Sequence, residues 1–378
     1  MMDKYRSRLR QARRIVLKVG SQVLLDESGG IDARIFSQLA SAVARMLNQG
    51  REVILVSSGA IASGKALLGR KSNALTLPEK QAIASLGQPL LMENYREAFS
   101  AYDILIGQVL LTHEDFSLRT RYLHSRNTLE QMLRMKILPV INENDAVAVE
   151  EIKFGDNDLL AALVAVMLKA DLLVILSIAP GLCDTDPLKD PKAKVIPVVE
   201  GLDKKLFECA ISGKSEAGSG GMKSKLRAAE IVGAAGIMTF IGSGKNPEAL
   251  EKLFEGKILG TLILAEKQRL KGLKHWLLFA GKPKGEIKID AGAVKALVER
   301  KKSLLPSGVV EVRGKFLAGE MVKVIDEQGK EIARGLVNFG AADLRRIKGL
   351  HTEKIPEVLG SKDYDEVIHR DNLVVSSK

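Results

Sequence analysis

The sequence predicts a three-layer α/β fold, in which an open, mostly parallel sheet carries helices on both faces. A small C-terminal β-barrel follows it. From Ile15 to about Leu264, short aliphatic runs alternate with amphipathic segments of helical period. Such continuous runs suit strands that are buried on both faces, and their alternation with helices indicates parallel pairing. After about Gly260, short strands of alternating polarity are separated by glycine turns, which is typical of a small barrel.

Each expected element of the sheet follows from its residue pattern. Aliphatic runs of three to five residues are the expected strands, and they lie at 15–19, 53–56, 104–106, 137–141, 172–176 and 237–241. Between them apolar residues recur at helical spacing, which predicts helices at about 32–49, 79–101, 122–136, 157–169, 222–235 and 247–254. Gly50 follows the first helix at the position where a left-handed residue commonly ends one.

Four segments divide the chain. Residues 1–14 form a basic leader, 15–264 form the α/β domain, 265–284 form a basic linker with the only tryptophan, Trp276, and 285–372 form the barrel. In the barrel, strands are expected at 286–290, 308–312 and 320–325, with one short helix at about 292–299. A chain of 378 residues accommodates two or three domains.

The composition excludes several classes of protein. No apolar run reaches the roughly 18–20 residues that a membrane helix needs, and the basic N-terminus lacks the pattern of a signal peptide. Two cysteines, Cys183 and Cys209, cannot form a disulfide framework, and the five histidines have no metal-ligand spacing. We therefore expect a cytoplasmic protein with no membrane partner and no structural metal.

The net charge of +11 is concentrated in two segments of the chain. Residues 1–14 contain six Lys or Arg against one Asp, and residues 261–302 contain eleven Lys or Arg against four acidic residues. The remainder of the chain is close to neutral. These basic segments are either an RNA-binding face or solvated lysines around a linker.

The glycine-rich stretch GSGGMKSKL at 218–226 has the chemistry of a phosphate cradle. Its glycines let backbone N–H groups approach a ligand, a lysine supplies charge, and the start of the following helix favours anions. The stretch matches neither G-x-x-x-x-G-K-[ST] nor G-x-G-x-x-G, because Lys223 stands where the second motif needs its third glycine. By itself the stretch could equally be a turn.

Other polar clusters follow the expected strands. They are KVGS at 18–21, SSGAI at 57–61, NEND at 142–145, GDND at 155–158 and the stretch that begins at Ser177. Each alone has a structural explanation, such as a helix N-cap or a polar turn. In open parallel sheets, however, ligands bind at the carboxyl ends of the strands. Lysines and N–H groups that converge there indicate phosphoryl transfer, and no Ser-His-Asp or Cys-His set supports covalent hydrolysis.

The order of these motifs resembles that of the glutamate 5-kinases, a family of the amino acid kinase superfamily. The resemblance rests on KVGS, SSGAI, PVINEND at 139–145, GDND and GGMKSK at 220–225, and it covers about residues 14–265. The tail resembles a PUA domain in D-x-GA at 290–293, SLLP-x-G at 303–308, ARGL at 333–336 and HRDN at 369–372. The resemblance implies an amino acid kinase fold followed by a PUA-like barrel.

The resemblance also implies an activity, the ATP-dependent phosphorylation of the γ-carboxylate of L-glutamate to L-glutamyl 5-phosphate in proline biosynthesis. The implied catalytic residues are Lys18, Lys225 and Asp158, with Asp158 orienting the two lysines. The implied substrate-binding residues are Ser58, Gly59, Ala60, Asn142, Asp145 and Asn157. The implied nucleotide-binding residues are Lys18, Gly20, Ser21, Ser177, Ile178, Ser219, Gly220, Gly221, Met222, Lys223, Ser224 and Lys225.

Ligands and partners are implied in the same way. ATP is the expected co-substrate, with Mg²⁺ between its β- and γ-phosphates and held largely by phosphate and water. Proline is an implied feedback inhibitor, the PUA-like domain implies RNA as a partner, and a homo-oligomer of two or four chains is expected. The γ-carboxylate of glutamate is ionised at neutral pH, so the reaction needs no general base, which agrees with the absence of histidine from the motifs that carry the kinase resemblance.

Ser177 and Ile178 depart from the Thr-Asp that this family has after the fifth strand. Ser177 keeps a hydroxyl group, but Ile178 removes an acidic group beside the nucleotide, which puts nucleotide affinity or base preference in question. Two alternatives stay open. One is a kinase of the same superfamily that phosphorylates N-acetylglutamate or a nucleoside monophosphate, and the other is an RNA-binding or regulatory protein on a kinase scaffold.

Overall fold

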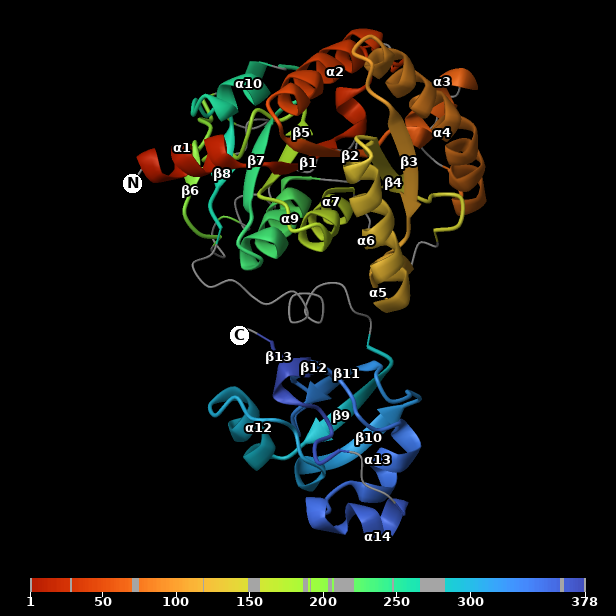
Figure 1. The fold of residues 1–378 in the computed structure, drawn as a ribbon, viewed down its shortest axis with the longest axis vertical. Coiled ribbons are helices and arrows are strands. Elements are labelled where there is room, and N and C mark those ends of the chain that lie inside the picture. The colour runs from red at the N-terminus through yellow and green to blue at the C-terminus, as the bar shows by residue number, and fades with distance from the viewer. Residues whose placement is uncertain are drawn as a thin grey trace. The chain divides into compact units, whose positions relative to one another are not determined.

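The computed structural model describes residues 2–27, 29–69, 75–117, 119–148, 157–185, 190, 192–202, 206, 221–246, 248–265, 283–360 and 364–376. The chain forms two compact units, Met1–Arg269 and Leu270–Lys378 (Figure 1). Cys209, Trp276 and most of the expected linker lie outside the described residues, as do residues 154–156 and 218–220 of the motifs.

Among the described residues, the first unit is built on one eight-stranded sheet of order β3-β4-β2-β1-β5-β7-β8-β6. In that order the strands are β3 (Ile106–Leu111), β4 (Leu138–Glu143), β2 (Glu52–Ser57), β1 (Arg14–Val19), β5 (Leu172–Ser177), β7 (Met238–Ser243), β8 (Thr261–Ile263) and β6 (Val198–Val199). Strands β7 and β8 pair antiparallel, and the other described neighbours pair parallel. The predicted mostly parallel sheet is therefore confirmed.

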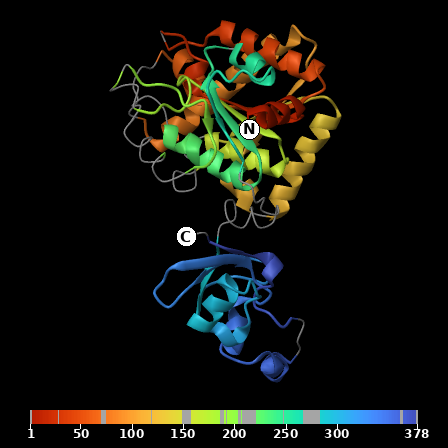
Figure 2. The same ribbon diagram turned by 90° about the vertical axis from the view of Figure 1, so that its left-hand side faces the viewer.

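Helices cover both faces of this sheet (Figures 1 and 2). One face carries α2 (Ala33–Asn48), α4 (Leu77–Ser100) and α10 (Glu248–Phe254), and the opposite face carries α6 (Arg119–Arg134), α7 (Asn157–Met167) and α9 (Met222–Ala234). Other described helices of this unit are α1 (Met2–Gln11), α3 (Ala60–Leu67) and α5 (His113–Ser117). This is the predicted three-layer arrangement. None of the described helices is both long and apolar enough to span a bilayer.

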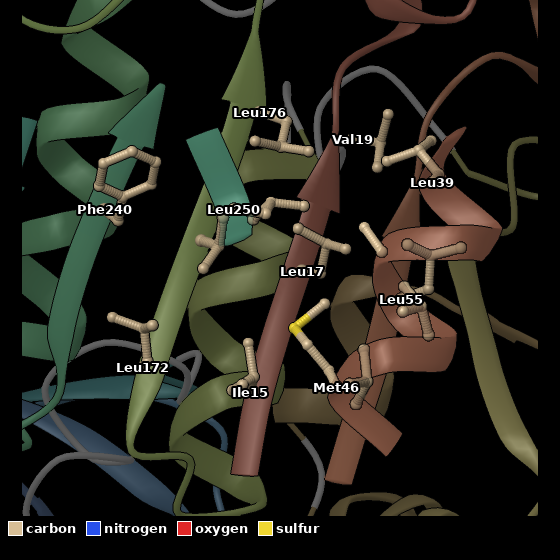
Figure 3. Packing of buried hydrophobic residues seen from close by; sticks show 14 of the residues in the cluster. Ile15, Leu17, Val19, Leu39, Met46, Leu55, Leu172, Leu176, Phe240 and Leu250 are labelled. Carbon is tan, nitrogen blue, oxygen red and sulfur yellow. The ribbon is translucent and has the colours of Figure 1, made fainter. Parts of the chain in front are cut away.

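The buried residues of β1 explain why its sequence is a continuous aliphatic run. Ile15, Leu17 and Val19 point to the same face and pack beneath α2 (Figure 3). Val16 points the other way and is also fully buried, so both faces of the strand need apolar residues. Because side chains alternate along a strand, Lys18 shares the face of Val16, which α7 and α9 cover. Lys18 therefore projects from β1 toward α7 and α9.

Two elements differ from the expectation. The expected position of the third strand at 104–106 is wrong, because β3 runs from Ile106 to Leu111. Gly107 and Gln108 interrupt the apolar pattern there, yet they pair with Pro139 and Val140 of β4. The basic leader is a helix, α1, and its Leu9 is fully buried in the core beneath the α2 face.

The second unit has its own sheet and its own core. In the described part of the chain, its five strands have the order β10-β9-β11-β12-β13. In chain order they are β9 (Gly285–Ile289), β10 (Val309–Gly314), β11 (Met321–Ile325), β12 (Glu331–Leu336) and β13 (Leu373–Val375), with helices α12 (Ala291–Val298), α13 (Ala341–Ile347) and α14 (Ile355–Leu359). Asp290 caps α12 by accepting a 2.7 Å hydrogen bond from Ala293 N–H. The predicted separate small β unit is confirmed.

Candidate active site

The carboxyl edge of the large sheet brings Lys18, Asp158 and Lys225 together. Lys18 Nζ lies 2.6 Å from Asp158 Oδ1, and Lys225 Nζ lies 3.0 Å from Asp158 Oδ2. The side chains of Lys18, Asp158 and Lys225 are only 4%, 0% and 6% exposed. Buried charges are costly unless they are paired, and these three groups together carry one net positive charge. We call them the lysine–aspartate cluster, and its charge suits an anionic ligand.

Three elements position this cluster. Lys18 is the penultimate residue of β1, Asp158 is the second residue of α7, and Lys225 is the fourth residue of α9. Helices α7 and α9 pack against each other, so their first turns meet above the end of β1. A carboxylate is favoured at a helix N-terminus and an ammonium group is not. Asp158 therefore offsets the cost of placing Lys225 in the first turn of α9.

The start of α9 adds polar groups beside the cluster. Ser224 Oγ lies 2.8 Å from Asp158 Oδ2 and 3.0 Å from the carbonyl oxygen of Gly221. Gly221 is the N-cap residue, so α9 begins at Met222 and Lys223, whose N–H groups belong to the first turn that has no acceptor within the helix. The sequence predicted these residues as one phosphate-binding loop, of which Ser219 and Gly220 lie outside the described residues.

Gly20 and Ser21 follow Lys18 at the same strand end. The N–H of Gly20 donates to the carbonyl of Leu176 at the end of β5, and Ser21 begins a short 3₁₀ helix. A Cβ atom on Gly20 would lie 3.7 Å from Lys18 Nζ. The absence of a side chain here therefore leaves room beside the ammonium group.

Ser177 and Ile178 lie next to these residues because β5 pairs with β1. Ser177 Oγ accepts a 3.0 Å hydrogen bond from Ala179 N–H, and its carbonyl accepts from Gly244 N–H of the loop after β7. Ile178 is 58% exposed. Ile178, which stands where Asp was expected, is thus an exposed apolar side chain at the sheet edge, where solvent or a bound ligand can contact it.

A second polar group, which we call the amide cluster, adjoins Asp158 through its neighbour Asn157. Asn157 Nδ2 lies 3.1 Å from the carbonyl oxygen of Ser57, 2.8 Å from Ser58 Oγ and 2.9 Å from Asn142 Oδ1. It therefore ties the ends of β2 and β4 to the first turn of α7. The resemblance implied Ser58, Asn142 and Asn157 as substrate-binding residues, and in the structure Asn157 contacts both of the others directly.

Gly59 and Ala60 form the start of α3 beside the amide cluster. Gly59 is the N-cap and has φ +120°, ψ −3°, a backbone conformation that only glycine adopts without strain. Because α3 begins at Ala60, the N–H groups of its first turn are directed toward the strand end, where they suit a carboxylate. Asp145 lies in the turn after β4, three residues beyond Asn142, and its N–H donates to the carbonyl of Glu143.

Three residues of α4 contact this region although sequence reasoning did not place them in the site. Gln88 Oε1 accepts a 2.8 Å hydrogen bond from Asn142 Nδ2. Tyr95 OH lies 2.7 Å from Ser57 Oγ, and Gln81 Nε2 donates to the carbonyl of Ala148 at 3.2 Å. Burial raises the pKa of Tyr95 well above its ordinary value, so its phenol stays protonated. The signal that was overlooked is the seven-residue spacing of these polar residues on the inner side of an amphipathic helix.

Helix α4 also touches the backbone of α3 directly. A Cβ atom on Gly87 would lie 1.9 Å from the carbonyl oxygen of Ala60, and a Cβ atom on Gly64 would lie 2.2 Å from the carbonyl oxygen of Ile83. Both positions therefore exclude any larger residue unless the helices move apart. This close crossing fixes the start of α3, which carries the N–H groups beside the amide cluster.

The arrangement can hold two anionic groups side by side and transfer a group between them. The lysine–aspartate cluster offers ammonium groups for one anion, while the start of α3 and the amide cluster offer N–H groups and polar side chains for the other. No set of three or more His, Cys, Asp or Glu side chains within the described residues could hold a metal ion. Both oxygens of Asp158 contact ammonium groups, so a cation that acts here would be carried by a ligand.

Comparisons with known proteins agree with this geometry. The model of the amino acid kinase family matches residues 13–243, and that of the PUA domain matches residues 285–359. The glutamate 5-kinase of Caldanaerobacter subterraneus subsp. tengcongensis is 48% identical over 362 residues, which are 96% of this chain and 97% of that protein. The glutamate 5-kinase of Thermus thermophilus is 47% identical over 367 residues, or 97% and 98% of the two chains.

A solved structure supports the fold independently of close sequence similarity. Carbamate kinase from Giardia lamblia bound to AMP-PNP superposes with a TM-score of 0.50 at 18% identity. The match covers 68% of this chain and all of that one. At this identity the likeness concerns the fold, and it shows that the α/β unit has the architecture of that kinase.

Proposed function

Because the chain belongs to the amino acid kinase family and, within it, to the glutamate 5-kinases, we propose that it transfers the γ-phosphoryl group of ATP to the 5-carboxylate of L-glutamate. The product is L-glutamyl 5-phosphate, and the reaction is the first step of proline biosynthesis. The single observation that carries the mechanism is the buried lysine–aspartate cluster, in which one carboxylate aligns two ammonium groups at the carboxyl edge of the sheet.

The two lysines stabilise the charge on the transferring phosphoryl group. Lys18 contacts its oxygens from the end of β1, and Lys225 bridges the β- and γ-phosphates of ATP from the first turn of α9. Phosphoryl transfer depends mainly on positioning and on neutralising oxygen charge, and groups that are already aligned do so without reorganising. Asp158 supplies that alignment because its two oxygens hold the two ammonium groups 2.6 and 3.0 Å away.

The acceptor lies on the side of the amide cluster. The N–H groups of Gly59 and Ala60 bind a carboxylate of glutamate at the start of α3. The N–H of Ser58 already donates to the Val19 carbonyl, so Ser58 contributes its hydroxyl group instead. Asn142, Asp145 and Asn157 bind the α-ammonium and α-carboxylate groups. The carboxylate of Asp145 favours a free ammonium group over an acylated amine, which carries no charge. Glutamate is therefore a better acceptor for this site than N-acetylglutamate.

No protein base takes part in the step. A glutamate γ-carboxylate has a pKa of about 4.3 and is ionised at neutral pH, so one of its oxygens attacks the γ-phosphorus directly. The bond between the γ-phosphorus and the oxygen shared with the β-phosphate breaks, and that oxygen leaves as part of ADP. The residues of the site hold the two reactants in line and balance the charge, and no proton has to be moved.

The phosphates of ATP, and not a carboxylate cluster among the described residues, would hold Mg²⁺ at this site. The donor set fits an ion that is held by the phosphates of ATP and by water, since both oxygens of Asp158 already contact ammonium groups. When bound, the ion neutralises charge on the β- and γ-phosphates. The nucleotide-binding residues are Lys18, Gly20, Ser21, Ser177, Ile178 and 219–225. Ile178 offers an exposed apolar surface in place of an acidic group, so nucleotide affinity or base preference is the property that this position affects.

Three partners complete the proposal. Proline carries the α-carboxylate and the ammonium group of glutamate, and we infer that it competes at the acceptor site. Residues 285–359, which match the PUA domain, bind RNA. Contacts to RNA phosphates weaken as salt is added, so an RNA affinity that does not fall with salt concentration would argue against this role. The chain assembles into a dimer or tetramer. Light scattering during size-exclusion chromatography measures the molar mass of the assembly directly.

The testing experiment supplies ATP, Mg²⁺ and one acceptor at a time, namely glutamate, N-acetylglutamate or UMP. Acyl phosphate is trapped as hydroxamate and ADP formation is followed in parallel. We expect hydroxamate and ADP in equal amounts with glutamate and only background with the other two acceptors. ADP formation without hydroxamate, or turnover of N-acetylglutamate or UMP in preference to glutamate, would overturn the proposal.

A further inference from the structure

A polar stripe on α4 reaches the ends of β2 and β4 and the turn after β4, on the acceptor side of the site. Gln81, Gln88 and Tyr95 stand at seven-residue intervals, which is nearly two full helical turns, so their side chains leave α4 from the same side. They hydrogen-bond respectively to the Ala148 carbonyl after β4, to Asn142 at the end of β4 and to Ser57 at the end of β2.

The middle contact of this stripe belongs to a relay of three amide groups. Gln88 Oε1 accepts from Asn142 Nδ2, and Asn142 Oδ1 accepts from Asn157 Nδ2. Backbone groups determine the orientation of the second and third amides. Asn142 Oδ1 also accepts from Glu143 N–H at 2.9 Å, and Asn157 Nδ2 also donates to the carbonyl of Ser57 at 3.1 Å. Asn142 therefore presents its NH₂ group to Gln88 and its oxygen to Asn157, and Asn157 presents its NH₂ group to Asn142.

The relay ends at an acceptor. Asn157 Oδ1 is buried and has no hydrogen-bond donor among the described residues. A buried carbonyl oxygen without a donor is destabilising, so such a group is retained where a ligand supplies the missing donor. The α-ammonium of an amino-acid substrate is a donor of the required kind, and Asn157 is the neighbour of Asp158 in the lysine–aspartate cluster.

We propose that Gln88 is a positioning residue that selects substrates with an α-ammonium group. It acts through Asn142, whose side chain it holds so that Asn157 keeps its oxygen available as the acceptor. This inference rests on the proposed function, because it assigns the α-ammonium of glutamate to Asn157 Oδ1. Gln88 contacts neither the phosphates nor the lysine–aspartate cluster in the proposal, so its removal affects glutamate and not ATP.

The burial of Gln88 supports a positioning role over a packing role. Its side chain is only 9% exposed and shares its helix with Leu91, which is fully buried. An apolar residue of the same length would fill the same space without the cost of desolvating an amide. A merely structural position on this helix face is therefore expected to be apolar, as its neighbours are.

The test compares Gln88→Met, which keeps the length but loses the acceptor, with Gln88→Glu, which keeps an oxygen at Oε1. Ser85→Ala is the matched control on the same helix, since Ser85 is exposed and bonds only the Gln81 carbonyl of its own helix among the contacts described. For each protein, KM for glutamate, KM for ATP, the inhibition constant of glutarate and the melting temperature are measured. Glutarate is the probe because it is glutamate without the α-ammonium.

We expect Gln88→Met to raise KM for glutamate about tenfold, as for loss of a buried hydrogen-bond partner, with KM for ATP and the inhibition constant of glutarate within threefold of wild type. Gln88→Glu and Ser85→Ala keep KM for glutamate within threefold. If Gln88→Met is too unstable to assay, Gln88→Leu removes the same acceptor with a smaller side chain. Equal weakening of glutamate and glutarate, a parallel rise in KM for ATP, or an unchanged KM for glutamate would overturn the inference.

Failure of the proposed function gives a different result. In that case the wild-type protein forms no hydroxamate from glutamate. If the wild type is active and only the discrimination between glutamate and glutarate fails to respond to Gln88, the reaction stands and the role of Gln88 does not.

Discussion

Replacing Asp158 by Asn tests whether one carboxylate organises both lysines. The substitution keeps the size of the side chain and one oxygen, but it removes the negative charge and places an NH₂ group against one of the two ammonium groups. In the structure those ammonium groups lie 2.6 and 3.0 Å from the carboxylate, and all three side chains are at most 6% exposed. The change therefore acts at a site where solvent screens the interactions between charges only weakly.

The size of the effect follows from these distances. At an effective dielectric constant of about 20, two unit charges about 3 Å apart attract by about 5 kcal/mol, and breaking a buried pair costs about 3–5 kcal/mol in net terms. For a unit of this size we expect the melting temperature to fall by about 10 °C. Turnover should fall by about 10²-fold or more, since the lysines lose their alignment.

The assay follows thermal unfolding of the full chain with and without saturating MgATP, together with hydroxamate formation. MgATP should raise the melting temperature of Asp158→Asn more than that of wild type, because phosphates replace part of the missing negative charge. Asp32→Asn is the control, since Asp32 caps α2, an amide oxygen can still cap, and its partner Arg34 is 84% exposed. A variant Asp158→Asn with turnover within threefold and melting within 2 °C of wild type would refute the reasoning.

Three further predictions concern other parts of the first unit. Lys225→Ala should lower turnover on the order of 10²-fold in the hydroxamate assay, and a change under threefold would show that the start of α9 is only structural. Gly87→Ala should destabilise the unit by about 3 kcal/mol in denaturant unfolding, because its Cβ atom would lie 1.9 Å from the Ala60 carbonyl oxygen; Gly233→Ala in α9, where a Cβ atom meets no heavy atom within 4 Å, should be neutral or stabilising by up to about 1 kcal/mol. Arg14 holds the pKa of Glu130 below its ordinary value of 4.5, so this pair stabilises fully above about pH 5 and less as the pH falls through the folded-state pKa. Glu130→Gln should therefore reduce the loss of unfolding free energy between pH 5 and 3 by about 1 kcal/mol or less, because solvent screens two side chains that are 20% and 22% exposed. Denaturant unfolding at both pH values measures this, and an unchanged pH profile would contradict it.

The strands were predictable because their sequence signal is local. A strand buried on both faces needs a mostly apolar run, and β1, β2, β4, β5 and β7 all have one. Strand β3 was displaced in the prediction because Gly107 and Gln108 break its run. The strand order depends on contacts between distant segments, and no local pattern specifies it.

The lysine–aspartate cluster was predictable from topology together with the resemblance. The rule that ligands bind at the carboxyl ends of parallel strands brings Lys18 and Lys225 to one edge although 207 positions separate them. The bridging contact of Asp158 with both lysines was implied only by the resemblance, and the structure shows it directly.

The contribution of α4 to the site could not be predicted, because the seven-residue spacing of its polar residues does not show that they face the site. Gln81, Gln88 and Tyr95 are ordinary residues of an amphipathic helix in sequence, and their partners at 57, 142 and 148 lie far away along the chain. Only the packing of α4 against the sheet edge shows that these polar side chains point inward. A helix start at 58–60 was implied, but the extent of α3 was not predicted, since its Ala, Ser and Gly residues carry no strong apolar period.

The most direct test of the central claim follows an oxygen atom. Glutamate with ¹⁸O in its 5-carboxylate is incubated with ATP and Mg²⁺, and hydroxylamine is added to cleave the acyl phosphate at its carbonyl carbon. If the carboxylate attacks the γ-phosphorus, the released phosphate carries one ¹⁸O atom, in an amount equal to the hydroxamate formed. Phosphate without ¹⁸O would show that water, and not the substrate carboxylate, receives the phosphoryl group, and the account of this site would be wrong.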